Sequence, residues 1–261
     1  YTLRVIQSGS YIVKERSGRG NVSSSTLVSL DTTDISDGNY TVNVVAEDIA
    51  GNLTTSNTLS ISIDNTPPET FNMTSSPYTT DTTPLLSWQT ATDVNSPVTY
   101  DVVIDSVTVS SDQLGTSYQV LTPYVDGVSH TLSIVAKDPL LNTRTVSSTF
   151  GVDLTPPSVG IPSVGINSNQ VTITYSYSDS FSGIGGHQIS INGGAYQSFS
   201  YPYSATLSDS PYTYSIKVLD LANNVSSING TFTVDSRKSY LTTKADFNTD
   251  SKVDLSDLSI L

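Results

Sequence analysis

The chain has 261 residues, a formal net charge of −13 and no cysteine. An acidic surface repels nucleic-acid phosphates and the anionic lipids that polybasic segments bind, so we expect neither nucleic acid nor such lipids as partners. Without cysteine there is no disulfide, and stability must come from packing or from bound metal ions. No apolar run is long enough for a transmembrane segment. The chain does not begin with Met and shows no signal peptide, which favours a piece of a larger protein.

One sequence pattern occurs three times. In each copy a strand of alternating apolar and polar residues ends in Asp, a short turn reaches Asn, and a last strand follows. The aspartates Asp48, Asp138 and Asp220 are spaced by 90 and 82 residues, close to the size of one small β-sandwich. Because the alternation has a period of two, it predicts β-hairpins. Their first strands are expected at 40–47, 130–136 and 212–218, and their last strands at 59–63, 150–152 and 232–234.

Proline pairs mark the boundaries between the copies. Pro67–Pro68 and Pro156–Pro157 follow the last strands of the first two copies. Proline lacks the amide hydrogen that a strand ladder needs, so each pair predicts a stiff, extended linker. We predict an all-β chain of sandwiches in a row, with domains at 1–65, 66–154 and 155–236 and a different segment at 237–261.

Earlier strands are expected in the second and third copies but not in the first. They cover 85–88 and 100–104 in the second copy and 171–177 and 188–191 in the third. Residues 1–5 align with 100–104, so the first domain lacks its first two strands. Either those strands are absent from this sequence, or another chain supplies them by strand donation, which would build a filament.

The three copies resemble bacterial immunoglobulin-like or fibronectin-III-like domains of large surface proteins. Trp88 with Tyr100-x-Val-x-Ile104 carries the resemblance in the second copy, and Asp179–Ile184 with Ile191–Gly194 carries it in the third. The Asp-x-Thr-Pro-Pro junctions complete it. The family implies tandem Ig-like β-sandwiches, and the segments 37–40 and 209–212 resemble its tyrosine corner. Its fold implies little about function.

Two histidines and an aromatic segment are candidates for other roles. His130 takes the tyrosine-corner position of the second copy, which favours a structural role, and His187 lies in a Gly-rich stretch that we expect to face solvent. An aromatic platform for carbohydrate requires rings that face solvent, whereas rings that alternate inward belong to the core. We favour core packing for the aromatic residues Tyr196, Phe199, Tyr201 and Tyr203.

The last segment has a different pattern. Over twelve residues that begin at Asp246, oxygen side chains fall at positions 1, 3, 5, 9 and 12, and position 7 offers a backbone carbonyl. Calcium takes six to eight oxygen ligands, and this spacing wraps them around one ion. We predict a Ca²⁺ site formed by Asp246, Asn248, Asp250, Lys252, Asp254 and Asp257.

This segment resembles half of a dockerin, an EF-hand-like calcium module that binds a cohesin on a scaffold protein. Asp257 at position 12 agrees with dockerins, and a helix is expected to start there. Ser251 stands where Gly is usual, which reduces the expected affinity for calcium. Leu255 and Ser256 are not the polar pair that dockerins use for recognition. The resemblance therefore implies calcium more strongly than a cohesin-like partner.

A second calcium hypothesis concerns the junctions between copies. Asp48 and Asp64, or Asp138 and Asp153, are expected at the same end of their hairpins, where an acid of the next domain, Asp93 or Asp179, could share an ion. The alternative, which we favour, is that Asp48, Asp138 and Asp220 only cap backbone amides in tight turns.

No catalytic triad, Cys–His pair or phosphate-binding loop occurs in the sequence. We therefore expect no enzyme. The chain is interpreted as an extracellular or cell-surface prokaryotic protein that acts as an adhesive stalk, filament or surface-layer component. The alternative is an accessory region of a secreted polysaccharide-degrading enzyme, attached through its dockerin to a cohesin scaffold.

Overall fold

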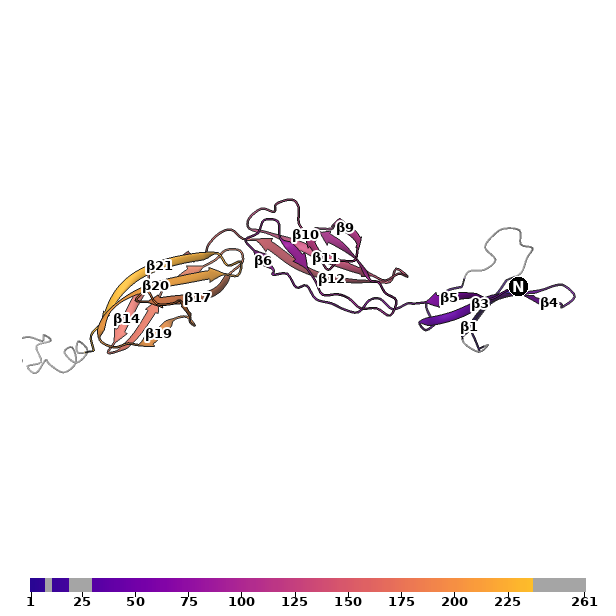
Figure 1. Cartoon of the computed structure of the whole chain (residues 1–261), viewed down its shortest axis with the longest axis horizontal. Coiled ribbons are helices and arrows are strands. Elements are labelled where there is room, and N and C mark those ends of the chain that lie inside the picture. Colours follow the sequence, from indigo (N-terminus) through magenta and orange to yellow (C-terminus); the bar gives the residue numbers. More distant parts are fainter. Residues whose placement is uncertain (8–10, 19–29, 237–261) are drawn as a thin grey trace, which may run out of the picture. The chain divides into compact units, whose positions relative to one another are not determined.

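The structure, a computed structural model, describes residues 1–7, 11–18 and 30–236 (Figure 1). Across these residues the chain forms 21 β-strands and no helix, so the predicted all-β fold is confirmed. None of the described segments forms a helix that could span a membrane. The predicted calcium loop and helix start at 237–261 lie outside the described residues. Below, the predicted domains 1–65, 66–154 and 155–236 are called the first, second and third repeat.

The first repeat forms one five-stranded sheet in the order β2-β1-β3-β4, with β5 also paired to β3. Thr2 of β1 faces Val45 of β3, and in the second repeat Asp101 faces Val135, so the predicted alignment of residues 1–5 with 100–104 is confirmed. A small core forms around Val5, which is fully buried. The strands are β1 (Thr2–Gln7), β2 (Tyr11–Ser17), β3 (Gly38–Glu47), β4 (Leu53–Thr55) and β5 (Leu59–Ile63).

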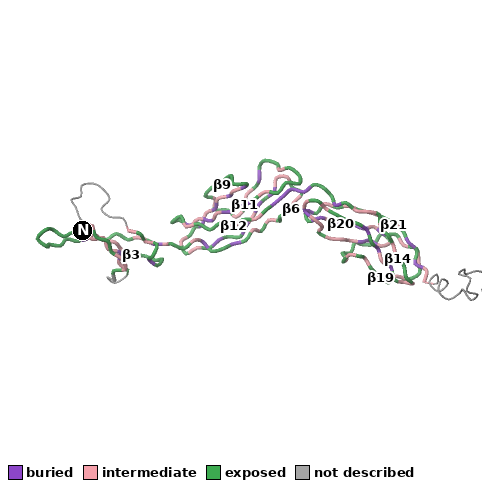
Figure 2. The backbone as a smooth tube through the Cα atoms, turned by 180° about the vertical axis from the view of Figure 1, so that it is seen from behind, coloured by how far each residue is buried: buried purple, intermediate pink, exposed green. Residues whose placement is uncertain are grey.

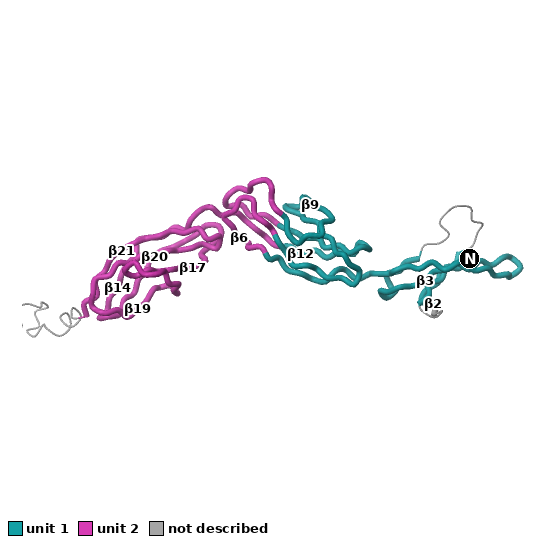
Figure 3. Tube along the Cα trace, in the orientation of Figure 1, with its two compact units in different colours: residues 1–74, 87–118, 132–147 teal, residues 75–86, 119–131, 148–261 magenta. Residues whose placement is uncertain are grey.

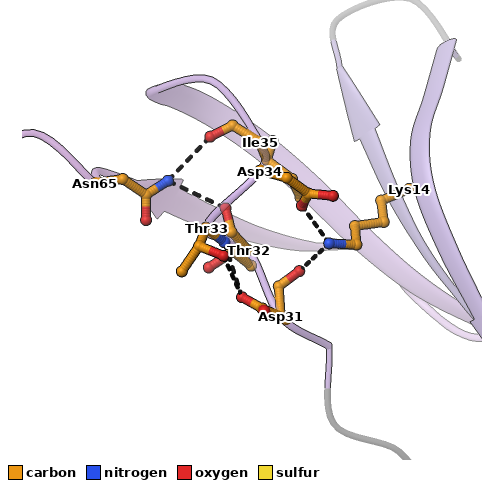
Figure 4. A network of polar contacts seen from close by, with 7 residues as sticks. All are labelled: Lys14, Asp31, Thr32, Thr33, Asp34, Ile35 and Asn65. Carbon is orange, nitrogen blue, oxygen red and sulfur yellow. Dashed lines mark hydrogen bonds and ion pairs between the residues drawn. The ribbon is translucent and has the colours of Figure 1, made fainter.

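The loop before β3 is held by side chains from two directions (Figure 4). Lys14 of β2 pairs with Asp34 and donates to the carbonyl of Asp31. Asn65, from beyond β5, donates to the carbonyls of Thr32 and Ile35 at 3.1 and 3.0 Å. This loop therefore lies against the end of the last strand of its own repeat.

The second repeat contains a five-stranded sheet, β6-β12-β11-β8-β9, and a short sheet, β10-β7. Trp88 and Tyr100 meet edge to face in its core, with ring centroids 5.7 Å apart. Strand β11 buries alternate residues, as the sequence predicts, and β12 is longer than predicted (Figure 2). The strands are β6 (Tyr78–Thr79), β7 (Leu85–Ser87), β8 (Thr99–Ile104), β9 (Val107–Gln113), β10 (Ser117–Gln119), β11 (Val128–Lys137) and β12 (Thr143–Val152).

The third repeat contains the sheets β18-β17-β20-β21, β14-β15-β19 and β13-β16. Val171 and Ile173 of β15 lie in one core cluster with Ile216 and Val218 of β20. The strands are β13 (Ser158–Val159), β14 (Ser163–Asn167), β15 (Gln170–Thr174), β16 (Tyr177–Ser178), β17 (Ile184–Ile191), β18 (Gln197–Ser198), β19 (Tyr203–Thr206), β20 (Ser210–Asp220) and β21 (Val225–Val234).

Both predicted tyrosine corners form, because the hydroxyls of Tyr40 and Tyr212 donate to the backbone carbonyls of Ser36 and Ser208 at 2.7 and 3.0 Å. In the second repeat the ring of His130 instead packs between Tyr124 and Phe150, which agrees with a structural role.

The chain divides into two compact units (Figure 3). One contains residues 1–74, 87–118 and 132–147, and the other contains 75–86, 119–131 and 148–261. The division passes through the second repeat, so the predicted domain limits stay predictions.

Candidate metal centres

The structure brings together six aspartates in two clusters of three. Asp64, Asp93 and Asp138 each offer a carboxylate oxygen, and these oxygens lie within 4.8 Å of one another. Asp153, Asp179 and Asp220 form a second cluster with the same spacing. Each cluster lies inside one compact unit. Five of these residues were candidates in the junction hypothesis; Asp48, a sixth candidate, belongs to neither cluster, and Asp220 was expected only as a turn residue.

The first cluster combines the end of the first repeat with two loops of the second. Asp64 directly follows β5, Asp93 precedes β8, and Asp138 directly follows β11. The amide of Asn95 donates to Asp93 Oδ1 at 2.7 Å, and its side chain donates to Asp64 Oδ2 at 2.6 Å. Asp138 is buried, whereas Asp64 and Asp93 are half-buried. These bonds position the carboxylates without neutralising them.

The second cluster repeats this construction one domain later and is more deeply buried. Asp153 follows β12, Asp179 follows β16 and Asp220 ends β20; Asp153 is 0% exposed and Asp220 2%. The amide of Ser182 donates to Asp153 Oδ2 at 3.1 Å, and that of Gly183 donates to Asp179 Oδ1 at 2.8 Å. The buried hydroxyl of Ser182 has no hydrogen-bond partner.

Among the described residues, no ion pair joins a lysine or arginine to either cluster. Three neighbouring carboxylates repel one another, and burial strengthens the repulsion because the local dielectric is low. A divalent cation bound between the carboxylates would offset both their mutual repulsion and the cost of burying their charges. The ligand atoms are all oxygens, which suits calcium or magnesium better than zinc or copper.

The turns that contain Asp138 and Asp220 also have the predicted capping role. Asp138 Oδ1 accepts the amides of Leu140 and Asn142 at 2.8 and 3.0 Å, and Asp138 Oδ2 accepts the Asn142 side chain at 2.8 Å. Asp220 and Asn224 form the same pair of contacts. Asp48 and Asn52 repeat it on an exposed turn of the first repeat. The predicted capping of backbone amides by Asp48, Asp138 and Asp220 is therefore confirmed.

The sequence predictions missed a second set of aspartates. Asp37, Asp126 and Asp209 each lie just before the hairpin of their repeat and reach the residues that follow its last strand. Asp126 accepts the Leu154 amide at 2.8 Å and the Thr155 hydroxyl at 2.9 Å. These two bonds lower the pKa of Asp126, with the amide contributing most. Asp37 and Asp209 lie three residues before their corner tyrosines, whereas Asp126 lies four residues before His130, so the sequence carried only a partial signal for this set.

The aromatic segment of the third repeat belongs to the core rather than to a sugar platform. Phe199, Tyr201 and Tyr203 pack against the core cluster. Tyr196 is exposed, but Lys217 Nζ lies 4.0 Å from the centre of its ring. The structure therefore offers no row of open rings for a carbohydrate at these four positions.

The expectation that His187 faces solvent was wrong. His187 lies in β17 opposite Val218, so its side chain shares the inner face of the sheet. Tyr177 packs on its ring with a centroid distance of 4.6 Å, and the Tyr175 hydroxyl bonds Nδ1 at 3.0 Å. Burial lowers the pKa of His187. His187, Ile189 and Ile191 alternate with the strand period, which indicates that their side chains share one face. The glycines just before His187 obscured this pattern in the sequence.

The described residues thus form an all-β protein in which one hairpin with a capped turn recurs in three successive repeats. Residues 8–65 match the model of a family described as a bacterial Ig-like domain. No curated protein matches the chain.

Several solved structures are similar to parts of the chain. The fibronectin(III)-like modules of Clostridium thermocellum CbhA are 16% identical, with 64% of this chain and 96% of that chain covered and a TM-score of 0.43. A two-domain fibronectin type III segment of chicken tenascin is 16% identical, with coverages of 64% and 98% and a TM-score of 0.28. A tetra-tandem repeat from the extending region of a large adhesion protein is 21% identical, with coverages of 90% and 66% and a TM-score of 0.28.

Proposed function

We propose that the chain is a non-enzymatic, extracellular or cell-surface repeat protein that acts as an adhesive or structural stalk, with calcium bound where its repeats join. The observation that carries this proposal is the recurrence of one three-aspartate arrangement at two successive junctions. Because the same cluster of aspartates recurs where one repeat meets the next, its role is to connect repeats. A reaction centre would instead need one distinct site.

Calcium is the ion that best fits the two clusters. Three carboxylates supply charge and several of the six to eight oxygens, and backbone carbonyls or water would supply the rest. The backbone amides that bind Asp93, Asp153 and Asp179 hold their carboxylates in place before an ion arrives. Such preorganisation reduces the entropic cost of binding.

The C-terminal loop is proposed as a further calcium site, with Asp246, Asn248, Asp250, Lys252, Asp254 and Asp257 as its ligands. This spacing holds one hard cation in a twelve-residue loop. Through this loop a cohesin-like partner would attach the stalk to a scaffold. A pull-down with immobilised cohesin, in calcium and in chelator, tests the attachment; capture that ignores calcium would contradict it.

Self-association through a donated strand remains part of the proposal for the first repeat, which has one sheet among its described residues. Ile12 and Leu59 are exposed on that repeat. Sedimentation velocity across a concentration series should show reversible oligomers. A monomer at every concentration would contradict strand donation and leave the calcium proposal untouched.

Calorimetric titration with Ca²⁺ tests the main proposal. The wild-type chain should bind several ions and gain thermal stability, because a ligand that binds only the folded state raises the melting temperature. Asp179→Asn and Asp93→Asn should each remove one binding event, and Asp246→Ala should remove another. Asp112→Asn, which changes an exposed acid of the second repeat, should change nothing in the ion count. No heat and no change in melting temperature at millimolar calcium would overturn the proposal.

A further inference from the structure

The two junctions are built from equivalent residues, but one pair of positions differs. Phe181 is the second residue after Asp179, and Asn95 is the second after Asp93. Both backbone amides donate to the preceding aspartate, at 3.0 and 2.7 Å. Across the junction, Gly151 and Ser62 each lie two residues before the aspartate that ends a repeat. At the second junction a large apolar side chain therefore faces glycine. At the first junction a polar side chain and serine occupy the equivalent positions.

At the second junction the Phe181 ring lies directly over Gly151. A Cβ atom added to Gly151 would lie 2.6 Å from Cζ of that ring, so only glycine leaves room for it. Tyr78 of β6 meets the ring edge to face, with centroids 5.6 Å apart and planes at 78°. Phe181 belongs to the third repeat, while Tyr78 and Gly151 belong to the second, and all three lie in one compact unit.

The turn between β20 and β21 adds a second apolar contact to this junction. Ala222 in that turn is only 3% exposed and lines a shared cavity with Tyr78 and Phe150. The equivalent positions in the other two turns, Ala50 and Leu140, are exposed. The third repeat thus buries apolar groups against the second at two points.

At the first junction the equivalent space is open. A cavity of about 620 Å³ lies beside Ser62, and Asn95 lines it together with Asp64 and Asp93. Among the described residues, no aromatic side chain lines this cavity. Val94, the nearest apolar candidate of the loop, is fully exposed. The contacts made here by Asn95 are polar and depend on the carboxylates.

We propose that Phe181 is an apolar plug that fixes the junction between the second and third repeats without metal, and that the first junction, which lacks a plug, moves more freely. Inter-domain contacts permit relative motion unless they are extensive and apolar. Burying an aromatic ring against glycine supplies a restraint that neither chelator nor pH removes. The inference concerns joint stiffness and does not require calcium to bind.

Spin-label distance distributions test the plug, because the chain has no native cysteine. One labelled pair, Thr108→Cys with Thr231→Cys, spans the second junction, and another, Thr54→Cys with Thr108→Cys, spans the first. Both measurements use the full chain in chelator. The first-junction distribution should be about twofold wider than the second-junction distribution, since only the latter has the apolar contact. Equal widths would overturn the proposal.

Three variants make the test specific. Phe181→Ala should widen the second-junction distribution to that of the first, and Gly151→Ala should do the same by displacing the ring without altering the third repeat. Tyr196→Ala removes an exposed ring of the same repeat and serves as the control that leaves the width unchanged. Thermal unfolding checks that every variant is folded. Folded Phe181→Ala and Gly151→Ala chains with the wild-type width would refute the plug, whatever the calcium titration shows.

The reciprocal change should transfer the plug. Asn95→Phe combined with Ser62→Gly places the ring and its glycine at the first junction, where the cavity has room for them. We expect this double variant to narrow the first-junction distribution in chelator. An unchanged distribution would show that the ring alone does not restrain a junction and would contradict the proposal.

Discussion

Asn142 donates its side-chain amide to the main-chain carbonyl of Asp64 at 3.0 Å, although the two residues are 78 positions apart. Asn224 makes the equivalent bond to the carbonyl of Asp153 at 2.7 Å. Each turn therefore binds the end of the preceding repeat as well as its own aspartate. The local turn sequence contributes to the junction between repeats.

Replacing these asparagines should separate the two roles of the turn. Asn142→Ala and Asn224→Ala lose a bond inside the turn and a bond to the preceding repeat, so each should cost about 1–3 kcal/mol of unfolding free energy. Asn52→Ala is the matched control and should cost less, because within the described part of the chain the bonds of Asn52 stay in its own turn. Urea unfolding of the three variants measures the difference. Equal costs would show that the bonds across the junctions do not stabilise the fold.

Stability should fall in acid through the aspartates that bind the ends of the last strands. The Thr66 hydroxyl, followed by the Asn65 amide, lowers the pKa of Asp37, and Asp126 is shifted in the same direction. A lowered folded-state pKa gives stability that is present above the ordinary carboxyl pKa of about 4 and is lost as pH falls through the folded value.

Melting temperatures measured from pH 7 to pH 2 should therefore decline below about pH 4. Asp126→Asn keeps the size of the side chain but removes its charge, so this variant should be less stable at neutral pH and should decline less on acidification. A decline as steep as that of the wild type would show that other carboxylates carry the effect.

Lys137 should give a modest, salt-dependent contribution to the second repeat. Its Nζ lies 2.8 Å from Asp101 and 2.5 Å from Asp112, and Asp112 is mostly exposed. We expect Lys137→Met to cost up to about 1 kcal/mol at low salt and less at high salt. The bonds to Asp101 and Asp112 raise the pKa of Lys137, so the contribution should also vanish as pH rises past the lysine range.

The fluorescence of Trp88, the chain's single tryptophan, reports on unfolding of this repeat. Lys217→Met, in the third repeat, should leave that transition unchanged. A loss from Lys137→Met that does not depend on salt would indicate packing of the lysine stem rather than an ion pair.

A side chain at position 230 should destabilise the third repeat. Gly230 faces Tyr214 across β20 and β21, and an added Cβ would overlap the Tyr214 ring. Because Tyr214 is buried, the ring cannot move aside freely, and Gly230→Ala should cost about 1–3 kcal/mol. Gly165→Ala is the control, since its Cβ would meet only one atom, at an ordinary contact distance of 3.8 Å. Chemical unfolding that gives equal stability for both variants would contradict this account.

The sequence by itself determined the repeated all-β organisation. The alternation in residues 130–136 and 212–218 has the strand period, and strand formation follows from that local pattern. The alignment of residues 1–5 with 100–104 gave β1 the same place in its repeat as β8 has in the second, and the register of both strands confirms it. Asp and Asn four residues apart likewise indicated the capped turns, because those bonds form within one short segment.

Only the tertiary structure decided which distant residues meet. Asp64, Asp93 and Asp138 come from three separate elements, and no local pattern shows that their oxygens converge. The Phe181 ring packs on Gly151, and His187 lies opposite Val218 on the inner face of its sheet. Both contacts depend on packing between segments far apart in the chain. Local propensity sets a strand and its faces, whereas a site needs the register and packing of several strands at once.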